Sequence, residues 1–267
     1  MRRWSWVLVL VIGFGLFEFV RHALISTQNP NFLPSLILLG AAVVPAAFVA
    51  FVYGLRLDFG VGGGVIALVA LVGGVVGTVT AGLLEYGTLQ RLGVLPMVAV
   101  GLIEEAAKLI APVAVVLLTR HRHRADGLLV GVAAGAGFAA LETMGYGFVT
   151  LISSNGNLGA VEGVLLLRGI LSPAAHMAWT GLTAAALWEA ARRGWHAGAL
   201  LRFGAVYLLA VALHATWDSV GATPAYAVLA AVSLGLLTFA AYRLSRHGHV
   251  PGIAPAPDRT RAPGVAR

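Results

Sequence analysis

The chain has 267 residues, of which 59% are hydrophobic and only 11% are charged. Because about 25% of the residues in soluble domains are charged, this composition excludes a soluble protein and predicts a polytopic membrane protein. The chain has no cysteine, which excludes disulfides, cysteine-ligated metals and a thiol nucleophile. The formal net charge of +7 would suggest nucleic acid in a soluble protein. Here the arginines cluster at the ends of apolar segments, which indicates topology signals and contact with the lipid bilayer, and we expect no nucleic-acid partner.

Apolar segments of bilayer-spanning length follow one another along the chain. Because a transmembrane helix needs about 20 apolar residues, we predict an all-α transmembrane bundle with about eight spans. The predicted spans are 4–22, 33–54, 61–83, 94–118, 127–151, 167–190, 199–220 and 224–243. Most arginines fall on one side of such a bundle, which predicts a multi-pass protein of the cell membrane with both termini cytoplasmic. We expect one transmembrane domain over 1–246 and a disordered cytoplasmic tail over 247–267, where proline, glycine and arginine are frequent.

Small residues and prolines within the spans predict how the helices pack and bend. Gly127, Gly131 and Gly135 recur at every fourth position, a spacing typical of closely packed membrane helices. Pro112 and Pro173 also fall inside predicted spans. A proline removes one helical hydrogen bond, so we expect a kink at each.

Three charged residues lie inside the span predicted over 94–118. These are Glu104, Glu105 and Lys108, the only lysine of the chain. A charge at the membrane centre costs at least ~2.5–3.5 kcal/mol, so three together require a reason. Lys108 lies one helical turn from both glutamates. One ion pair would neutralise one glutamate, and the second carboxylate is then a candidate functional group.

Later spans contain further ionisable residues at a matching depth. Glu142, His176 and His214 lie in successive spans, and Asp218 follows His214 by one helical turn. Glu104, Glu142 and the two histidines are each about eight to ten residues from the outer ends of their predicted spans. At 1.5 Å per residue they would lie roughly 12–16 Å below the extracytoplasmic face. Four helices are therefore predicted to bring two carboxylates and two imidazoles to one level.

This set of side chains suits two kinds of hydrolytic site. Catalytic zinc sites commonly use two histidines and one glutamate and keep a position open for water. Glutamate and histidine can also activate water without a metal. The structural alternatives are a plain ion pair at Lys108 and histidines that only hydrogen-bond between helices. Asp218 is expected to orient His214. Arg168 either holds a substrate carbonyl or extends to the membrane surface, and the second is favoured.

Four short motifs together resemble the PrsW family of intramembrane metalloproteases, distant relatives of the CAAX prenyl endopeptidases. The family pattern is Glu-Glu-x-x-Lys, then Phe-x-x-x-Glu, then a histidine, then His-x-x-x-Asp, each on its own span. The matching residues, in this order, are Glu104-Glu105-Ala-Ala-Lys108, Phe138-Ala-Ala-Leu-Glu142, His176 and His214-Ala-Thr-Trp-Asp218. Thr143 follows Glu142 where the family pattern has asparagine. The resemblance covers about 94–220, the expected catalytic core.

The resemblance implies an intramembrane metalloendopeptidase that cuts a membrane-spanning protein. One such cut is the first-site cleavage of an anti-sigma factor. Glu104 would be the general base, with Glu105 and Lys108 supporting it. A divalent metal, expected to be zinc, would be held by Glu142, His176 and His214, with Asp218 orienting His214 or completing the coordination. A metal-free mechanism would use the same residues to bind water.

Two other functions are compatible with buried glutamates and histidines. A proton- or cation-coupled transporter would use them as a relay, but it predicts acids spread through the membrane depth, internal repeats and broken helices. The sequence places its acids at one level and shows no clear repeat. A non-catalytic relative that binds partners is the third possibility. The protease is favoured.

Overall fold

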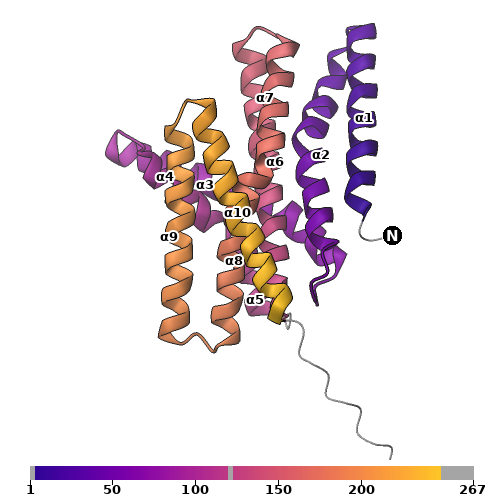
Figure 1. Cartoon of the computed structure of the whole chain (residues 1–267). Helices are drawn as coiled ribbons and strands as arrows, with labels where there is room; N and C mark the ends of the chain where they lie inside the picture. Colours follow the sequence, from indigo (N-terminus) through magenta and orange to yellow (C-terminus); the bar gives the residue numbers. More distant parts are fainter. Residues whose placement is uncertain (1–3, 120–122, 248–267) are drawn as a thin grey trace, which may run out of the picture.

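The structure is a computed structural model that describes residues 4–119 and 123–247 of the chain. Helices are the only regular secondary structure in these two stretches. The predicted all-α bundle is therefore confirmed (Figure 1). The tail predicted to be disordered lies outside the described residues, apart from its first residue.

Seven helical segments of the described chain are long and apolar enough to cross a membrane. The unbroken ones are α1 (Ser5–Thr27), α2 (Leu33–Tyr53, preceded by the short helix η2, Pro30–Phe32), α3 (Gly63–Leu92), α6 (Asp126–Ser153), α9 (Ala197–Ser219) and α10 (Thr223–His247). The seventh runs over Leu158–Arg192 and is interrupted: α7 (Leu158–Leu171) leads through the short helix η3 (Ser172–Ala174) into α8 (His176–Arg192). The remaining predicted span, 94–118, is helical but broken into α4 (Met97–Lys108) and α5 (Ile110–Leu118).

Both interruptions have a proline as their physical cause. Pro112 has no N–H to donate to the carbonyl of Lys108, so the hydrogen-bond ladder of α4 stops there. Pro173 interrupts the ladder after α7 in the same way. The kinks predicted at the two prolines are thus complete breaks. Their consequence is that Lys108 is the last residue of α4 and His176 is the first residue of α8.

Helix α6 is the centre of the bundle and packs against α2, α3, α7 and α8. Its contact with α8 depends on the predicted glycines. A Cβ atom at Gly135 would lie 2.5 Å from the carbonyl oxygen of His176, and one at Gly131 would meet the carbonyl oxygen of Thr180. Only glycine permits this approach, so the close packing predicted from the four-residue spacing is confirmed.

The outer helices expose long apolar faces. Helix α1 lies at one edge of the bundle, with α2 between it and α6, and α9 lies towards the opposite edge (Figure 1). Leu8 and Phe19 on α1 and Val228 and Phe239 on α10 are among the exposed large hydrophobic side chains. Such faces are stable in lipid and not in water. The protein is therefore a multi-pass membrane protein.

Candidate active site

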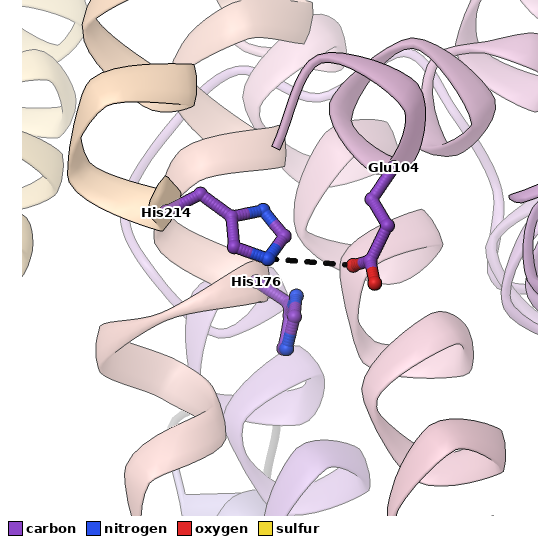
Figure 2. A group of neighbouring side chains, drawn as sticks. All are labelled: Glu104, His176 and His214. Carbon is purple, nitrogen blue, oxygen red and sulfur yellow. Dashed lines mark ion pairs between the residues drawn. The ribbon is translucent and has the colours of Figure 1, made fainter. Parts of the chain in front are cut away.

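Three buried side chains from three helices point into a common space. Glu104 comes from α4, His176 from α8 and His214 from α9 (Figure 2). One ligand-type atom of each lies within 4.8 Å of those of the other two. His214 Nε2 lies 3.5 Å from Glu104 Oε2. Residues 110 positions apart in the sequence thus meet in the interior of the bundle.

Lys108 binds both glutamates of its own helix, as the spacing predicted. Its Nζ atom lies 2.9 Å from Glu105 Oε1 and 3.1 Å from Glu104 Oε2. Glu105 also contacts His214, with 2.8 Å between Glu105 Oε1 and His214 Nδ1. The second glutamate is therefore not a spare charge. Glu105 joins the lysine to one histidine, and Glu104 faces the other nitrogen of the same ring.

His176 joins this group to α6 and α7. Its Nδ1 atom lies 2.7 Å from Lys108 Nζ, and its Nε2 atom lies 3.0 Å from Glu142 Oε2. Glu142 in turn lies 2.7 Å from the NH2 atom of Arg168. These contacts, together with those of Glu105 and His214, form one continuous chain of polar groups across the five helices α4, α6, α7, α8 and α9. It explains how so many ionisable side chains are accommodated in an apolar bundle.

Arg168 does not extend to the membrane surface, which was the favoured expectation. Besides Glu142, its Nε atom lies 3.4 Å from Thr143 Oγ1, and its guanidinium carbon lies 3.9 Å from the centre of the Tyr146 ring. All three partners are on α6. The hydrogen-bonded ion pair outweighs the gain from reaching water. The sequence did not predict this contact, because it depends on how α7 packs against α6.

Asp218 lies at the other end of the chain of polar groups. Its Oδ2 atom is 3.2 Å from His214 Nε2, and 30% of its side chain is exposed. His214 Nε2 thus faces both Asp218 and Glu104. Asp218 was expected beside His214, and its position agrees with a residue that orients the ring.

Aromatic rings surround the two histidines and hold their orientations. Trp179 stacks on His214 with 4.9 Å between ring centres and meets His176 edge-on at 5.6 Å. Its indole Nε1 donates to Ser233 Oγ of α10 at 2.9 Å. The Phe138 ring packs against His176 and lies 4.4 Å from Lys108 Nζ. These rings place the cluster in apolar surroundings, where electrostatic interactions are stronger than in water.

One cavity of about 140 Å³ opens onto the cluster. We call it the active-site cavity. Its walls come from α6, α7, η3, α8, α9 and α10, and the residues that matter here are Glu142, Arg168, His176, Trp217, Asp218 and Tyr226. Trp217 and Tyr226 meet edge-to-face at 4.8 Å on the side of α9 and α10. A substrate entering this cavity would meet Glu142 and His176 directly.

Carboxylates outnumber the lysine and arginine side chains of the cluster. Glu104, Glu105, Glu142 and Asp218 lie with Lys108 and Arg168, so two negative charges remain if both histidines are neutral. In addition, Glu105 Oε2 is buried without a hydrogen-bond partner, whereas Glu104 Oε2 contacts Lys108 and Glu142 Oε2 contacts Arg168 and His176. A divalent cation would offset this excess of carboxylates. The donor set, two imidazoles and carboxylates, suits zinc.

The two histidines differ in whether their present contacts leave a nitrogen lone pair free to bind a metal. The contact from His214 Nδ1 to Glu105 favours the tautomer that leaves the Nε2 lone pair free, an arrangement common around metal-ligating histidines. His176 has Lys108 on one nitrogen and Glu142 on the other. To offer a lone pair at Nε2 it must carry its proton on Nδ1, so Lys108 must then rest on its two glutamates alone.

The structure groups the predicted site residues differently from the expectation. Glu104, predicted as the general base, lies with the two histidines in the group able to hold a metal, whereas Glu142 and Asp218, predicted as ligands, lie beside one histidine each. The sequence pattern brought all of these residues to the same site. Which of them lie next to each other in the site depends on the helix break after Lys108, where α4 ends.

A scan against protein-family models matches residues 4–244 to the model described as PrsW family intramembrane metalloprotease. The chain belongs to the PrsW family. The match also covers the first three spans, which carry none of the motifs on which the resemblance rested. Searches of curated proteins and of solved structures found no match. Membership of the PrsW family supports an intramembrane protease that acts on a membrane-spanning substrate, and the family's description implies a divalent metal.

Proposed function

We propose that this PrsW-family chain is a zinc-dependent endopeptidase that hydrolyses a peptide bond in or beside a membrane-spanning segment. The observation that carries the proposal is the buried group of Glu104, His176 and His214, whose ligand-type atoms all lie within 4.8 Å of one another. A divalent cation held by this group would offset the excess of carboxylates in the cluster. Family membership supports the proteolytic reaction.

In this proposal Glu104, His176 and His214 hold the metal, and Glu105 fixes the tautomer of His214. Two histidines and one glutamate form a common ligand set of catalytic zinc. Lys108 lies against both glutamates and keeps the buried carboxylates compatible with an apolar interior. Asp218 faces the same nitrogen of His214 as the metal would, and it would complete the coordination.

Glu142 is then the group best placed to act as general base. The sequence predicts Glu104 as the base and Glu142 as a metal ligand, so the two roles are exchanged. Glu142 lines the active-site cavity, whereas Glu105 is fully buried. Bound zinc would polarise the scissile carbonyl and make water a stronger nucleophile. The water oxygen bonds to the carbonyl carbon, and Glu142 takes the proton that the water loses. It returns that proton to the leaving nitrogen as the C–N bond breaks.

Arg168, Trp217 and Tyr226 line the active-site cavity and would contact a substrate bound there. Arg168 contacts Glu142 at 2.7 Å and holds its carboxylate towards the cavity. The cavity volume of about 140 Å³ admits little more than a short stretch of unwound backbone with small side chains. A substrate helix must therefore unwind locally before it is cut. An anti-sigma factor, the substrate class implied by the resemblance, is one single-span candidate.

The transporter is not favoured. The family match points to a protease. Among the described residues, the ionisable side chains around His176 and His214 are joined in one contact network. Two broken helices are present, but both breaks deliver residues to that cluster.

The test is cleavage by the protein in its membrane. Membranes containing the wild-type chain would be compared with membranes containing Glu142→Gln, and new protein N-termini would be identified by mass spectrometry. Wild type is expected to generate N-termini within or next to single membrane spans that Glu142→Gln does not generate. Identical sets of N-termini, with both proteins folded and equally abundant, would contradict the proposed function.

A further inference from the structure

A second site, unrelated to the catalytic cluster, lies between α2, α6 and α10. It is a cavity of about 480 Å³, which we call the α2–α10 cavity. Its apolar wall includes Phe48 and Phe51 of α2, Leu128 of α6, and Leu234 and Leu237 of α10. It lies where the end of α2 approaches the end of α10, at the lower end of the bundle in Figure 1.

The mouth of this cavity is positively charged. Arg56, in the loop after α2, lines it together with Tyr242 and Ser245 of α10. The guanidinium group of Arg246 lies 5.2 Å from the centre of the Tyr242 ring. Arg56 is the one cation among the residues that line this cavity, and the polar groups beside it are hydroxyls. Arg56 follows the end of α2 and Arg246 lies near the end of α10, where a membrane protein meets the headgroups of the lipid.

No carboxylate among the described residues is paired with Arg56. Asp58 is close in sequence, but its Oδ2 atom lies 3.0 Å from His123 Nδ1. Asp126, fully buried at the start of α6, accepts hydrogen bonds from three backbone N–H groups, those of Gly60, Val61 and His123. Both acids of this region are thus engaged elsewhere, and the charge of Arg56 is uncompensated.

Two other cavities along α2 differ from the α2–α10 cavity in the charges that line them. The cavity between α1, α2 and α7 also contains an arginine, but Arg21 lies 2.8 Å from Glu162 Oε1 and 3.6 Å from Glu18 Oε2, so its charge is neutralised. The cavity between α2, α3 and α6 is lined without any charged residue. Apolar cavities of similar size therefore occur with paired charges or with none. The α2–α10 cavity combines an apolar wall with an unpaired cation at its mouth.

We propose that the α2–α10 cavity binds one anionic phospholipid, with its headgroup at Arg56 and an acyl chain along the wall formed by α2 and α10. The apolar wall matches a hydrocarbon chain, and Arg56 matches an anionic headgroup. The lipid would bridge α10, which is mostly exposed along its span, to the centre of the bundle. The proposal does not depend on the proteolytic activity.

Binding and charge selectivity would be measured by native mass spectrometry of delipidated protein in detergent. Phosphatidylglycerol and phosphatidylcholine with the same acyl chains would be added separately. Wild type is expected to retain one phosphatidylglycerol in preference to phosphatidylcholine. Arg56→Gln is expected to lower the affinity for phosphatidylglycerol about fivefold, the effect of removing one charge near a headgroup. Arg202→Gln, which removes an exposed arginine on α9 outside the cavity, is the matched control and is expected to change nothing.

The position of the lipid would be measured with phosphatidylglycerol that carries a photoreactive group on its acyl chain. Cross-links in the wild type are expected in 48–57 and 234–245. Ala241→Trp, which fills the cavity, is expected to abolish them, and Ala241→Leu serves if the tryptophan variant does not fold. Three outcomes would each overturn the proposal. The wild type could retain the two lipids equally, or Arg56→Gln and Arg202→Gln could lose affinity for phosphatidylglycerol equally. The cross-links could also be spread evenly over the exposed faces of α1 and α10.

Discussion

The Nζ atom of Lys108 lies 2.7 Å from Nδ1 of His176, although the two residues are 68 positions apart. Lys108 ends one helix and His176 begins another, and each position follows from a helix break associated with a proline. The contact joins the two glutamates of α4 to the histidine that contacts Glu142 on α6. Much of the chemistry of the site therefore depends on where two membrane helices stop.

Removing the charge of Lys108 is expected to destabilise the fold. Lys108→Met leaves Glu104 and Glu105 buried without their lysine partner, and breaking a buried ion pair from one side costs about 3–5 kcal/mol. The free energy of unfolding in detergent would measure this. Lys108→Met combined with Glu105→Gln should be less destabilised than Lys108→Met alone, because one carboxylate is then neutral. An additive result in this double-mutant cycle would show that the pair is not coupled.

The contact between α6 and α8 is expected to depend on glycine at position 135. Gly135→Leu would force side-chain atoms into the backbone of His176 and separate the two helices. We expect loss of folded protein on size-exclusion chromatography, with a destabilisation of about 3 kcal/mol or more from overpacking. Gly145→Leu, on the same helix but with open space at its Cβ, is the control and should remain folded.

Arg168→Gln is expected to slow cleavage without removing the metal. The substitution releases Glu142 from its 2.7 Å contact. Losing a residue that orients a functional side chain typically costs about tenfold to a hundredfold in rate. Cleavage of any substrate found in the N-terminal search, measured beside zinc content, would test this. Arg168→Lys should recover part of the rate, and a normal rate in Arg168→Gln would remove Arg168 from the mechanism.

Glu104→Gln and Glu142→Gln are expected to fail in different ways. If Glu104 is a ligand, its glutamine variant binds zinc weakly, whereas Glu142→Gln retains zinc but does not cleave. Metal titration of the two purified variants separates these roles. Zinc retained by Glu104→Gln and lost by Glu142→Gln would restore the assignment first expected from the sequence, with Glu104 as base and Glu142 as ligand.

Zinc is also expected to stabilise the folded protein. A ligand at a hundred times its dissociation constant stabilises the state that binds it by about 2.7 kcal/mol. The melting temperature of metal-free protein should therefore rise when zinc is added and fall again with a chelator. His214→Ala should show no such rise. An equal rise in both proteins would indicate binding elsewhere.

The fold was largely predictable because the apolar spans and small residues are local signals. The boundaries of α6 and α9 lie close to those predicted, and the glycines on α6 meet α8 as their spacing indicated. The breaks at Pro112 and Pro173 were predicted only as kinks. A proline fixes the loss of one hydrogen bond, but the packing of neighbouring helices decides whether the helix bends or stops.

The members of the site were also predictable, because a charge in an apolar span is conspicuous. Glu104, Glu105, Lys108, Glu142, both histidines and Asp218 all belong to the contact network that the structure describes. Their pairing was not predictable. Which carboxylate faces which imidazole depends on the rotation of each helix about its axis. The contact of Arg168 with Glu142 joins two helices in the same way, and no sequence spacing encodes it.

The most direct test is elemental analysis of the purified protein, with wild type beside His176→Ala and His214→Ala. His22→Ala, which alters an exposed histidine on α1, is the matched control. We expect about one zinc per chain in the wild type and in His22→Ala, and none in the two cluster variants. Folded wild-type protein that takes up no divalent metal, or equal metal in all four proteins, would contradict a metal centre at Glu104, His176 and His214.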